Sequence, residues 1–185
     1  DSAFMRRAIS KMIESDLQLY TVGAARNGQE AVEKVQRLRP DVVTMDVEMP
    51  EMNGLQALKQ IQKVLPVPVI MLSSFTDVGT KATLDALELG AVDFFLKSDL
   101  IKEPLDPDLV KEFLLCVKAA AVAKIPEATR TIDHTEYLDV QKQRESQVDL
   151  VIIGSSTGGP SALQTVLPRF TPDFPVPILV IQHMP

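Results

Sequence analysis

Two kinds of segment alternate along the chain, and this alternation limits the possible folds more than any other feature. In one kind, apolar residues recur at helical spacing; in the other, they follow one another in short runs. We expect helices over residues 2–14, 27–38, 55–65, 81–89, 106–124 and 161–167, and strands over residues 17–22, 42–45, 67–72, 92–96, 150–153 and 176–181. Strands that alternate with helices form βαβ units, so the predicted fold class is α/β, with a doubly wound parallel sheet.

The polarity of the chain changes between residues 125 and 148, where charged and polar residues predominate. We interpret this stretch as a linker between a first domain, residues 1–124, and the N-terminal part of a second α/β domain, residues 149–185. The second part has too few residues to bury a core. The first predicted helix also has no strand before it, although that strand is usually central in a βαβ protein. We therefore expect the natural chain to begin earlier and to continue further.

The composition argues against several classes of protein. The net charge of −6 does not suit a nucleic-acid-binding surface, because phosphate contacts need clustered Lys and Arg. The single cysteine, Cys116, excludes an internal disulfide and fits a reducing cytosol, so we expect a cytoplasmic protein. Cys116 lies on an apolar helix face, where we expect it to be part of the core. No run of about 18 apolar residues is present, so no membrane insertion is expected.

Polar side chains follow three of the predicted strands at the point where each ends. These are Asp46, Ser73 and Lys97. Since the carboxyl ends of parallel strands meet at one edge of a sheet, the three should lie together, and Asp1 should face the same crevice from the start of the first helix. A carboxylate nucleophile, a hydroxyl donor, a lysine and bound Mg²⁺ suit the transfer of a phosphoryl group. The alternative is that Asp46 is a turn residue and Lys97 a surface charge.

These residues stand in motifs that resemble those of the response-regulator receiver domain. The motifs are Asp-Ser-Ala-Phe-Met-Arg-Arg at residues 1–7, Met-Asp-Val-Glu-Met-Pro-Glu-Met-Asn-Gly at residues 45–54, and Gly-Ala-Val-Asp-Phe-Phe-Leu-Lys at residues 90–97. The resemblance implies that the first domain is a flavodoxin-like receiver domain that lacks its first strand. It also implies that the domain is switched by phosphorylation in the presence of Mg²⁺.

The resemblance assigns a role to each residue of this group. Asp46 is the implied phospho-acceptor. The implied Mg²⁺ ligands are Asp1, Asp46 and the backbone carbonyl of Glu48, and the implied switch residues are Ser73, Phe94 and Lys97. The chain departs from the family pattern at Ser98, where receiver domains usually have a proline after a cis peptide bond. A cis bond before serine would cost about 2.5–4 kcal/mol, so either this loop is rebuilt or its surroundings hold the strain.

A glycine-rich turn follows the predicted strand at residues 150–153. Gly154-Ser155-Ser156-Thr157-Gly158 fits the nucleophile-elbow pattern with Ser156 at its centre, and backbone N–H groups at the start of the next helix could form an oxyanion hole. His183, at the end of the next strand, is the candidate general base. On the pattern alone, an anion-binding turn without catalysis is an equally good interpretation.

The surroundings of this turn resemble the start of the catalytic domain of the chemotaxis protein-glutamate methylesterases, a family that joins a receiver domain to this domain by a linker. The motifs are Val-Ile-Ile-Gly-Ser-Ser-Thr-Gly-Gly-Pro at residues 151–160 and Val-Ile-Gln-His-Met-Pro at residues 180–185. The resemblance implies a Ser-His-Asp triad with Ser156 as nucleophile and His183 as base. The aspartate of that triad is expected downstream of Pro185.

The two resemblances together imply a chemotaxis response regulator of two-component signal transduction. Its implied activity is hydrolysis of glutamyl methyl esters, and deamidation of glutamines, on the cytoplasmic helices of chemoreceptors. A histidine kinase is the implied phospho-donor, and phosphorylation of Asp46 is expected to relieve inhibition by the receiver domain. The 185-residue chain itself is expected to lack esterase activity. The alternative is a receiver without catalysis, acting as a phosphorylation-dependent binding module or a DNA-binding regulator; the sequence beyond Pro185 would distinguish the two.

Overall fold

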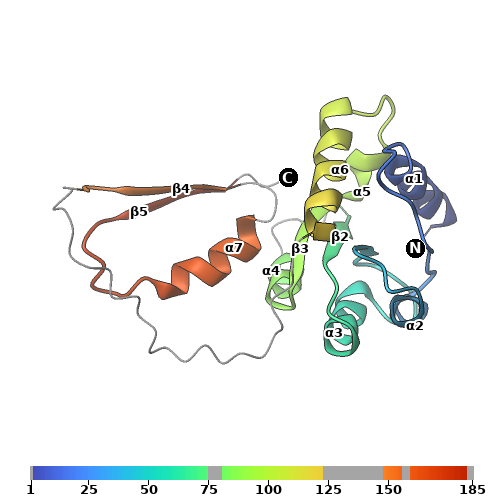
Figure 1. Ribbon diagram of the computed structural model, residues 1–185, viewed down its shortest axis with the longest axis horizontal. Coiled ribbons are helices and arrows are strands. Elements are labelled where there is room, and N and C mark those ends of the chain that lie inside the picture. The colour runs from blue at the N-terminus through green and yellow to red at the C-terminus, as the bar shows by residue number, and fades with distance from the viewer. Residues whose placement is uncertain (1, 75–80, 123–147, 156–158, 183–185) are drawn as a thin grey trace.

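The computed structural model describes residues 2–74, 81–122, 148–155 and 159–182, which form two parallel sheets with helices (Figure 1). The first part contains α1 (Ala3–Ile13), α2 (Gly28–Leu38), β1 (Val43–Asp46), α3 (Gly54–Val64), β2 (Val69–Ser73), α4 (Lys81–Glu88), β3 (Ala91–Leu96), α5 (Lys97–Ile101) and α6 (Pro107–Val122). The second part contains β4 (Val151–Ser155), α7 (Gly159–Val166), the 3₁₀ helix η2 (Leu167–Arg169) and β5 (Ile178–Gln182). The predicted α/β class is confirmed.

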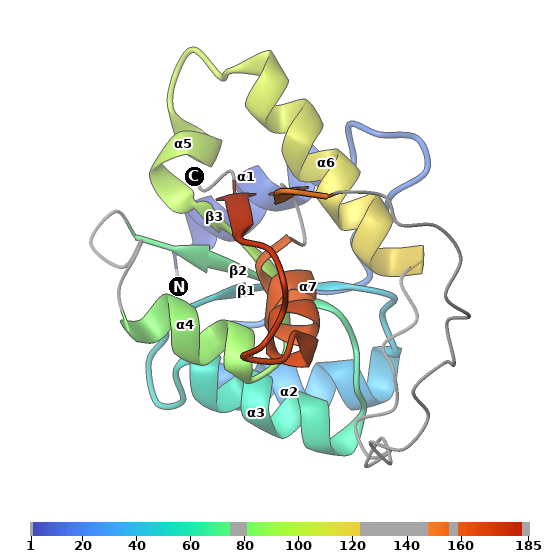
Figure 2. The same ribbon diagram turned by 90° about the vertical axis from the view of Figure 1, so that its left-hand side faces the viewer.

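The first sheet has the strand order β1-β2-β3, and both pairs of neighbours are parallel. Alternate residues of β2 point to opposite faces because the side-chain period of a strand is two. Val69 and Met71 join a core with α2, α3 and α4, whereas Ile70 and Leu72 join a core with α1, α5 and α6. Figure 2 shows the two helical layers on either side of the sheet. The doubly wound arrangement is therefore confirmed.

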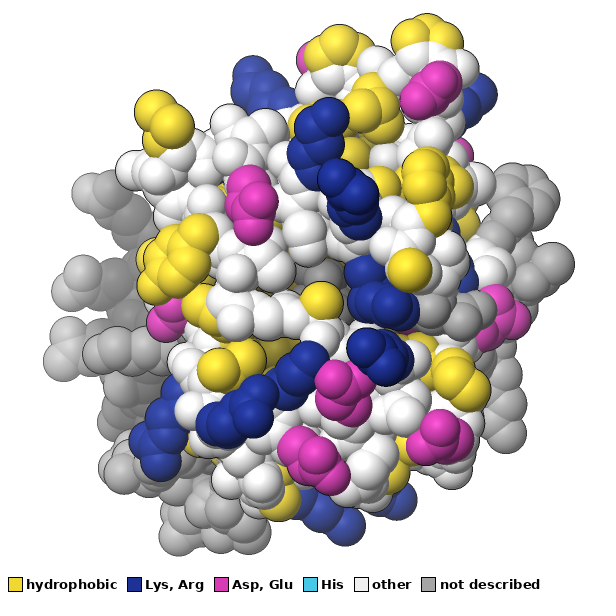
Figure 3. Space-filling model, turned by 90° about the vertical axis from the view of Figure 1, so that its right-hand side faces the viewer, with side chains coloured by type: hydrophobic (Ala, Val, Ile, Leu, Met, Phe, Trp, Pro, Cys, Tyr) yellow, Lys and Arg dark blue, Asp and Glu magenta, His cyan; other side chains and the backbone are white. Residues whose placement is uncertain are grey.

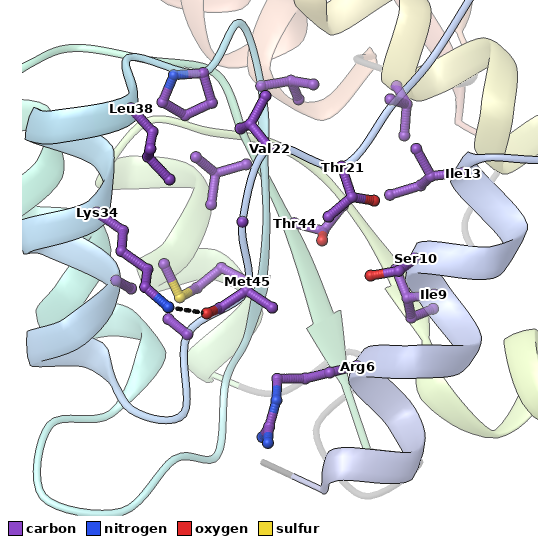
Figure 4. A pocket seen from close by; sticks show the side chains of 18 of the residues that line it. Arg6, Ile9, Ser10, Ile13, Thr21, Val22, Lys34, Leu38, Thr44 and Met45 are labelled. Atoms are coloured by element: carbon purple, nitrogen blue, oxygen red, sulfur yellow. Dashed lines mark hydrogen bonds between the residues drawn. The ribbon is translucent and has the colours of Figure 1, made fainter. Parts of the chain in front are cut away.

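The predicted strand at residues 17–22 is wrong, because this segment forms no ladder with β1. A cavity of about 320 Å³ lies between them, lined by residues of α1, residues 18–25, α2 and β1. Figure 4 shows Thr21 and Thr44 together in this cavity, across from Ser10 and Ile13 of α1. Thr21 Oγ1 is buried and has no hydrogen-bond partner among the described residues. A strand exists only through pairing with a neighbour. The strand expected before α1 stays a prediction.

Cationic side chains gather on the face that contains this cavity (Figure 3). Arg6 of α1 and Lys34 of α2 are among the residues that line the cavity, as is Arg39 just beyond α2. Asp41 and Asp46 line the same cavity, so cationic and acidic side chains both lie on this face, while the chain as a whole carries a net charge of −6.

The second sheet pairs β4 with β5 in parallel, from Val151 opposite Ile178 to Ser155 opposite Gln182. Its two faces differ in exposure, because the burial of both strands alternates residue by residue. On the open face, Ile152 and Ile181 are 59% and 58% exposed. The described residues thus leave one apolar face of this sheet uncovered, which agrees with the expectation that residues 149–185 do not bury a core.

Candidate phosphorylation and esterase sites

Asp46 and Lys97 meet at the carboxyl edge of the first sheet. Asp46 is the last residue of β1, and Lys97 follows directly after β3 as the first residue of α5. Nζ of Lys97 lies 2.9 Å from Oδ1 of Asp46, and the two side chains are 15% and 9% exposed. The structure thus brings together two residues that are 51 positions apart in the sequence, and it places a carboxylate with its countercharge in a largely dry environment.

Ser73 ends β2, the strand between those that position Asp46 and Lys97. It is 3% exposed, and its Oγ has no hydrogen-bond partner among the described residues. The end of β1 is fixed to the end of β2 by a hydrogen bond from the Val47 N–H to the Leu72 carbonyl. Buried hydroxyl groups are normally paired because leaving one unpaired costs free energy. Ser73 therefore has a hydroxyl that an anion held at this edge could accept from.

Glu48 contacts Asp46 and Lys97, and it also binds Ser74, a residue that was not predicted to belong to the site. The Glu48 N–H donates to Oδ1 of Asp46 over 3.0 Å. Its carboxylate accepts a hydrogen bond of 2.7 Å from Oγ of Ser74 and lies 3.7 Å from Nζ of Lys97. The only signal for Ser74 was its place directly after Ser73, at the end of an apolar strand. The site is thus a chain of polar contacts that crosses the ends of β1, β2 and β3.

A tight turn after Asp46 holds the backbone of this residue in place. The Gly54 N–H donates to the Val47 carbonyl over 2.9 Å, and Gly54 packs so closely that a Cβ there would collide with the Asp46 carbonyl oxygen. The next helix, α3, begins with a complete capping box between Asn53 and Gln56. Two backbone donors of the helix start are satisfied in this way, so the turn ends in a rigid element.

The loop after Lys97 is rebuilt relative to the family pattern. The only cis bond among the described residues is Glu103–Pro104, so the bond before Ser98 is trans. The chain passes from β3 directly into the short helix α5, at a place where the sequence predicts a loop. Phe94, the implied switch aromatic, is 3% exposed and packs in the core between the sheet and α2, α3 and α4.

The chemistry of the donors at this edge fits Mg²⁺. Mg²⁺ takes oxygen ligands, commonly one or two carboxylates with water and phosphate oxygens. The Asp46 carboxylate and the Glu48 backbone carbonyl are donors of this kind. Asp1, the further carboxylate implied by the resemblance, lies outside the described residues. Within those residues, no three His, Cys, Asp or Glu side chains are grouped to hold a metal ion.

The predicted esterase residues, Ser156 and His183, also lie outside the described residues. Their neighbours are described, and they are paired. Ser155 and Gln182 end β4 and β5 opposite each other, and Oγ of Ser155 donates to Oε1 of Gln182 over 2.5 Å. The structure therefore brings to one edge of the second sheet the two strands after which the serine and the histidine follow in the sequence.

Cys116 belongs to the core, as predicted, and not to either site. It is 1% exposed, and its Sγ lies 3.9 Å from Oδ2 of the buried Asp93. Burial and the nearby Asp93 carboxylate raise the pKa of the Cys116 thiol to about 12.

Among the described residues, each helix is too short or too polar to span a membrane.

Comparisons with known proteins match both parts of the chain. The family model described as the response regulator receiver domain matches residues 1–103. The family model described as CheB methylesterase matches residues 151–185. These two matches agree with the order of parts expected from the sequence. The boundaries at residues 124 and 148 stay predictions.

Two similar proteins agree with both matches. Protein-glutamate methylesterase/protein-glutamine glutaminase of Pyrococcus horikoshii is 45% identical over 190 residues, which cover 100% of this chain and 51% of that protein. The protein of Syntrophomonas wolfei with this name, numbered 1, is 47% identical and covers 100% of this chain and 54% of its own length. The chain thus spans about half the length of these relatives.

A solved structure shows the same fold for the first part. The crystal structure of the response regulator domain of Thermotoga maritima CheB has a TM-score of 0.61 and 43% identity, and it covers 67% of this chain and 92% of its own. The flavodoxin-like receiver fold is thereby confirmed. The chain belongs to the response regulator family, as a receiver domain followed by the start of a CheB methylesterase domain.

Proposed function

We propose that the full-length protein is a chemotaxis response regulator whose output is protein-glutamate methylesterase and protein-glutamine deamidase activity. The observation that carries the proposal is the pair of Asp46 and Lys97 beside the Ser73 hydroxyl, which has no partner among the described residues, in one chain with the start of a methylesterase domain. By resemblance, the protein acts in the cytoplasm without membrane insertion. Its substrates are glutamyl methyl esters and glutamines on the cytoplasmic helices of chemoreceptors.

In the receiver part, a carboxylate oxygen of Asp46 attacks the phosphorus of a phosphohistidine on the partner kinase. The P–N bond breaks, the histidine leaves, and an acyl phosphate forms on Asp46. Lys97 exchanges the Asp46 oxygen for a phosphoryl oxygen, and Ser73 donates its hydroxyl proton to another. Mg²⁺, held by Asp46, the Glu48 carbonyl and Asp1, would supply neutralising charge on the phosphoryl oxygens. The cationic side chains of Arg6 and Lys34 on this side of the domain favour approach of a negatively charged phospho-donor.

In the esterase part, Oγ of Ser156 attacks the side-chain carbonyl of a glutamyl methyl ester, and His183 takes the hydroxyl proton. The protonated histidine then gives that proton to the methoxide, and methanol leaves. Water hydrolyses the acyl-serine in a second step, which restores the serine and gives glutamate. A glutamine side chain reacts in the same way and releases ammonia. The aspartate that orients His183 is expected downstream of this chain.

Control by phosphorylation follows if the unphosphorylated receiver domain shields the serine site. Phosphorylation at Asp46 would then change the receiver surface and open access to Ser156. The 185-residue chain by itself should be inactive in either state. It holds only the start of the catalytic domain, without the aspartate expected to orient His183, and the described residues leave the face with Ile152 and Ile181 uncovered.

The nucleophile assignment is tested in the full-length protein by methanol release from methylated chemoreceptor membranes. Ser156→Ala should abolish release while acetyl phosphate still labels Asp46. Ser155→Ala tests the register of the motif, because it makes the same change one residue away; it should lower the rate and still release methanol above the background of Ser156→Ala. Activity in Ser156→Ala together with none in Ser155→Ala would show that the elbow is assigned one residue too late.

A further inference from the structure

Gln182 contacts both ends of the segment that contains Ser156. At one end, Ser155 donates its hydroxyl hydrogen bond of 2.5 Å to Oε1 of Gln182. At the other end, Gly159 begins α7, and a Cβ on Gly159 would collide with the same Oε1 and lie 2.8 Å from Oγ of Ser155. The last residue of β4 and the first residue of α7 therefore both lie against the side-chain amide oxygen of Gln182, the last residue of β5. A side chain at position 159 would require the Gln182 amide or the Ser155 side chain to move from this arrangement.

The hydrogen bond lies on the covered face of the second sheet. Ser155 and Gln182 are half-buried and Gly159 is buried, whereas Gly154 and Ile181, the preceding residues of the two strands, are exposed. A hydrogen bond that is partly shielded from water is stronger electrostatically than one in bulk solvent. The Ser155–Gln182 pair is therefore suited to hold the two strand ends in register.

We propose that Gln182 is a positioning residue of the esterase, acting through its hydrogen bond with Ser155. This inference rests on the proposed function, because it takes Ser156 and His183 as nucleophile and base. Ser156 follows Ser155 in the sequence, and His183 follows Gln182. The amide oxygen thus ties the start of the serine segment to the strand that leads into the histidine, and the contact with Gly159 holds the end of that segment.

The physical reason for such a tie is the short reach of proton transfer. A nucleophile and its base must stay within hydrogen-bonding distance, and a displacement of about 1 Å can cost about 100-fold in rate. Gln182 and Ser155 need not touch the substrate to have this effect. Their loss should therefore lower kcat and leave KM nearly unchanged.

The test uses the full-length enzyme with four variants: Ser155→Ala, Gln182→Leu, the double variant, and Gln182→Glu. Gln182→Leu removes the acceptor at similar size, and we expect a 10- to 100-fold loss of kcat. Ser155→Ala should lose about as much, and the double variant little more than either, because both changes break one hydrogen bond. Gln36→Leu, the same change on the exposed surface of α2, is the matched control and should keep wild-type kcat.

Gln182→Glu separates positioning from simple packing. Its carboxylate still accepts from Ser155, so kcat at high pH should recover most of the loss seen in Gln182→Leu. The added negative charge favours the protonated imidazole of His183, so the acid limb of the kcat/KM profile should move to higher pH. Thermal melting of each variant shows which have lost their fold. Ser155→Ala, the smallest change, carries the test if Gln182→Leu does not fold.

Labelling of Ser156 by a fluorophosphonate gives a second readout, and its rate should fall in parallel with kcat. Wild-type kcat in both Ser155→Ala and a folded Gln182→Leu would overturn the inference, as would independent effects that multiply in the double variant. A loss in Gln182→Leu that Gln182→Glu does not restore would also overturn it. If the wild-type enzyme shows no turnover that depends on Ser156, the proposed function itself is wrong. If the wild type turns over normally and the variants are unaffected, only the proposed role of Gln182 is wrong.

Discussion

Nζ of Lys97 and Oδ1 of Asp46 form an ion pair of 2.9 Å between the start of α5 and the end of β1. Because both side chains are largely removed from water, each charge compensates the other at short range. Breaking such a pair by removing one partner is much more costly than removing both, since the remaining charge stays buried without its partner. The free energy of unfolding of suitable variants therefore reports directly on this ion pair.

Lys97→Met should lower the free energy of unfolding of the receiver domain by about 3 kcal/mol. In the Asp46→Asn background, the same substitution should cost much less, because the remaining carboxylate near Lys97, that of Glu48, is 59% exposed and stays solvated. Urea unfolding of the wild type, the two single variants and the double variant measures the coupling. Equal costs of Lys97→Met in both backgrounds would show that the two charges do not stabilise each other.

Gly54→Ala should damage the phosphorylation site without touching a side chain in it. The added Cβ would collide with the Asp46 carbonyl oxygen and lie 2.9 Å from its carbonyl carbon, so backbone has to move. We expect a loss of about 1–3 kcal/mol in stability and slower labelling of Asp46 by acetyl phosphate. Gly154→Ala is the control, since no heavy atom lies within 4 Å of its added Cβ. Wild-type stability and labelling in Gly54→Ala would contradict the described packing.

Cys116 should be inert to thiol reagents while the protein is folded. With a pKa raised to about 12, only about 10⁻⁴ of the thiol is ionised at pH 8, and the thiolate is the reactive form. Its burial blocks access as well. Reaction with a chromogenic disulfide at pH 8 should therefore be slow in buffer and fast in denaturant. Rapid labelling of the native protein would mean that the space between β3 and α6 is open.

The hydrogen bond between Asp16 and Lys118 should make stability fall in acid. Nζ of Lys118 lies 2.6 Å from Oδ2 of Asp16, and this hydrogen bond, with one from the Gln18 N–H, lowers the pKa of Asp16 below its usual 3.8. A carboxyl with a lowered folded-state pKa contributes stability that is present above pH 3.8 and is lost as pH falls through the folded-state pKa.

Asp16→Asn should therefore be less stable than the wild type at pH 7, and the difference should shrink below about pH 4. The matched control is Asp41→Asn, which makes the same change at an exposed position. Urea unfolding at a series of pH values measures the difference for each variant. A gap between Asp16→Asn and the wild type that stays constant down to pH 2 would rule out this pair as its source.

The sequence was sufficient to predict the meeting of Asp46 and Lys97, because both follow apolar strands and parallel strands end at a common edge. It was not sufficient for the link between Glu48 and Ser74. That contact depends on how the turn after β1 bends toward the end of β2, and neither spacing nor residue type encodes the bend. The helix α5 was missed for a related reason, since five residues are too few to show a helical period.

The segment at residues 17–22 shows a different limit. Its apolar residues fit a strand, but a strand also needs a neighbour to pair with, and here a cavity lies between this segment and β1. The pattern of a sequence predicts which residues favour extended structure, whereas pairing depends on what lies beside them. The hydrogen bond between Ser155 and Gln182 was equally beyond prediction, because it depends on the register of β4 and β5.

The most direct test of the central claim is the initial rate of methanol release by the full-length protein from methylated chemoreceptor membranes, with and without acetyl phosphate and Mg²⁺. The proposed function predicts a rate that rises with the phospho-donor in the wild type, stays at its unstimulated level in Asp46→Asn, and is absent in Ser156→Ala under both conditions. Stimulation of Asp46→Asn equal to that of the wild type, or turnover by Ser156→Ala, would contradict the claim that phosphorylation at one site controls hydrolysis at the other.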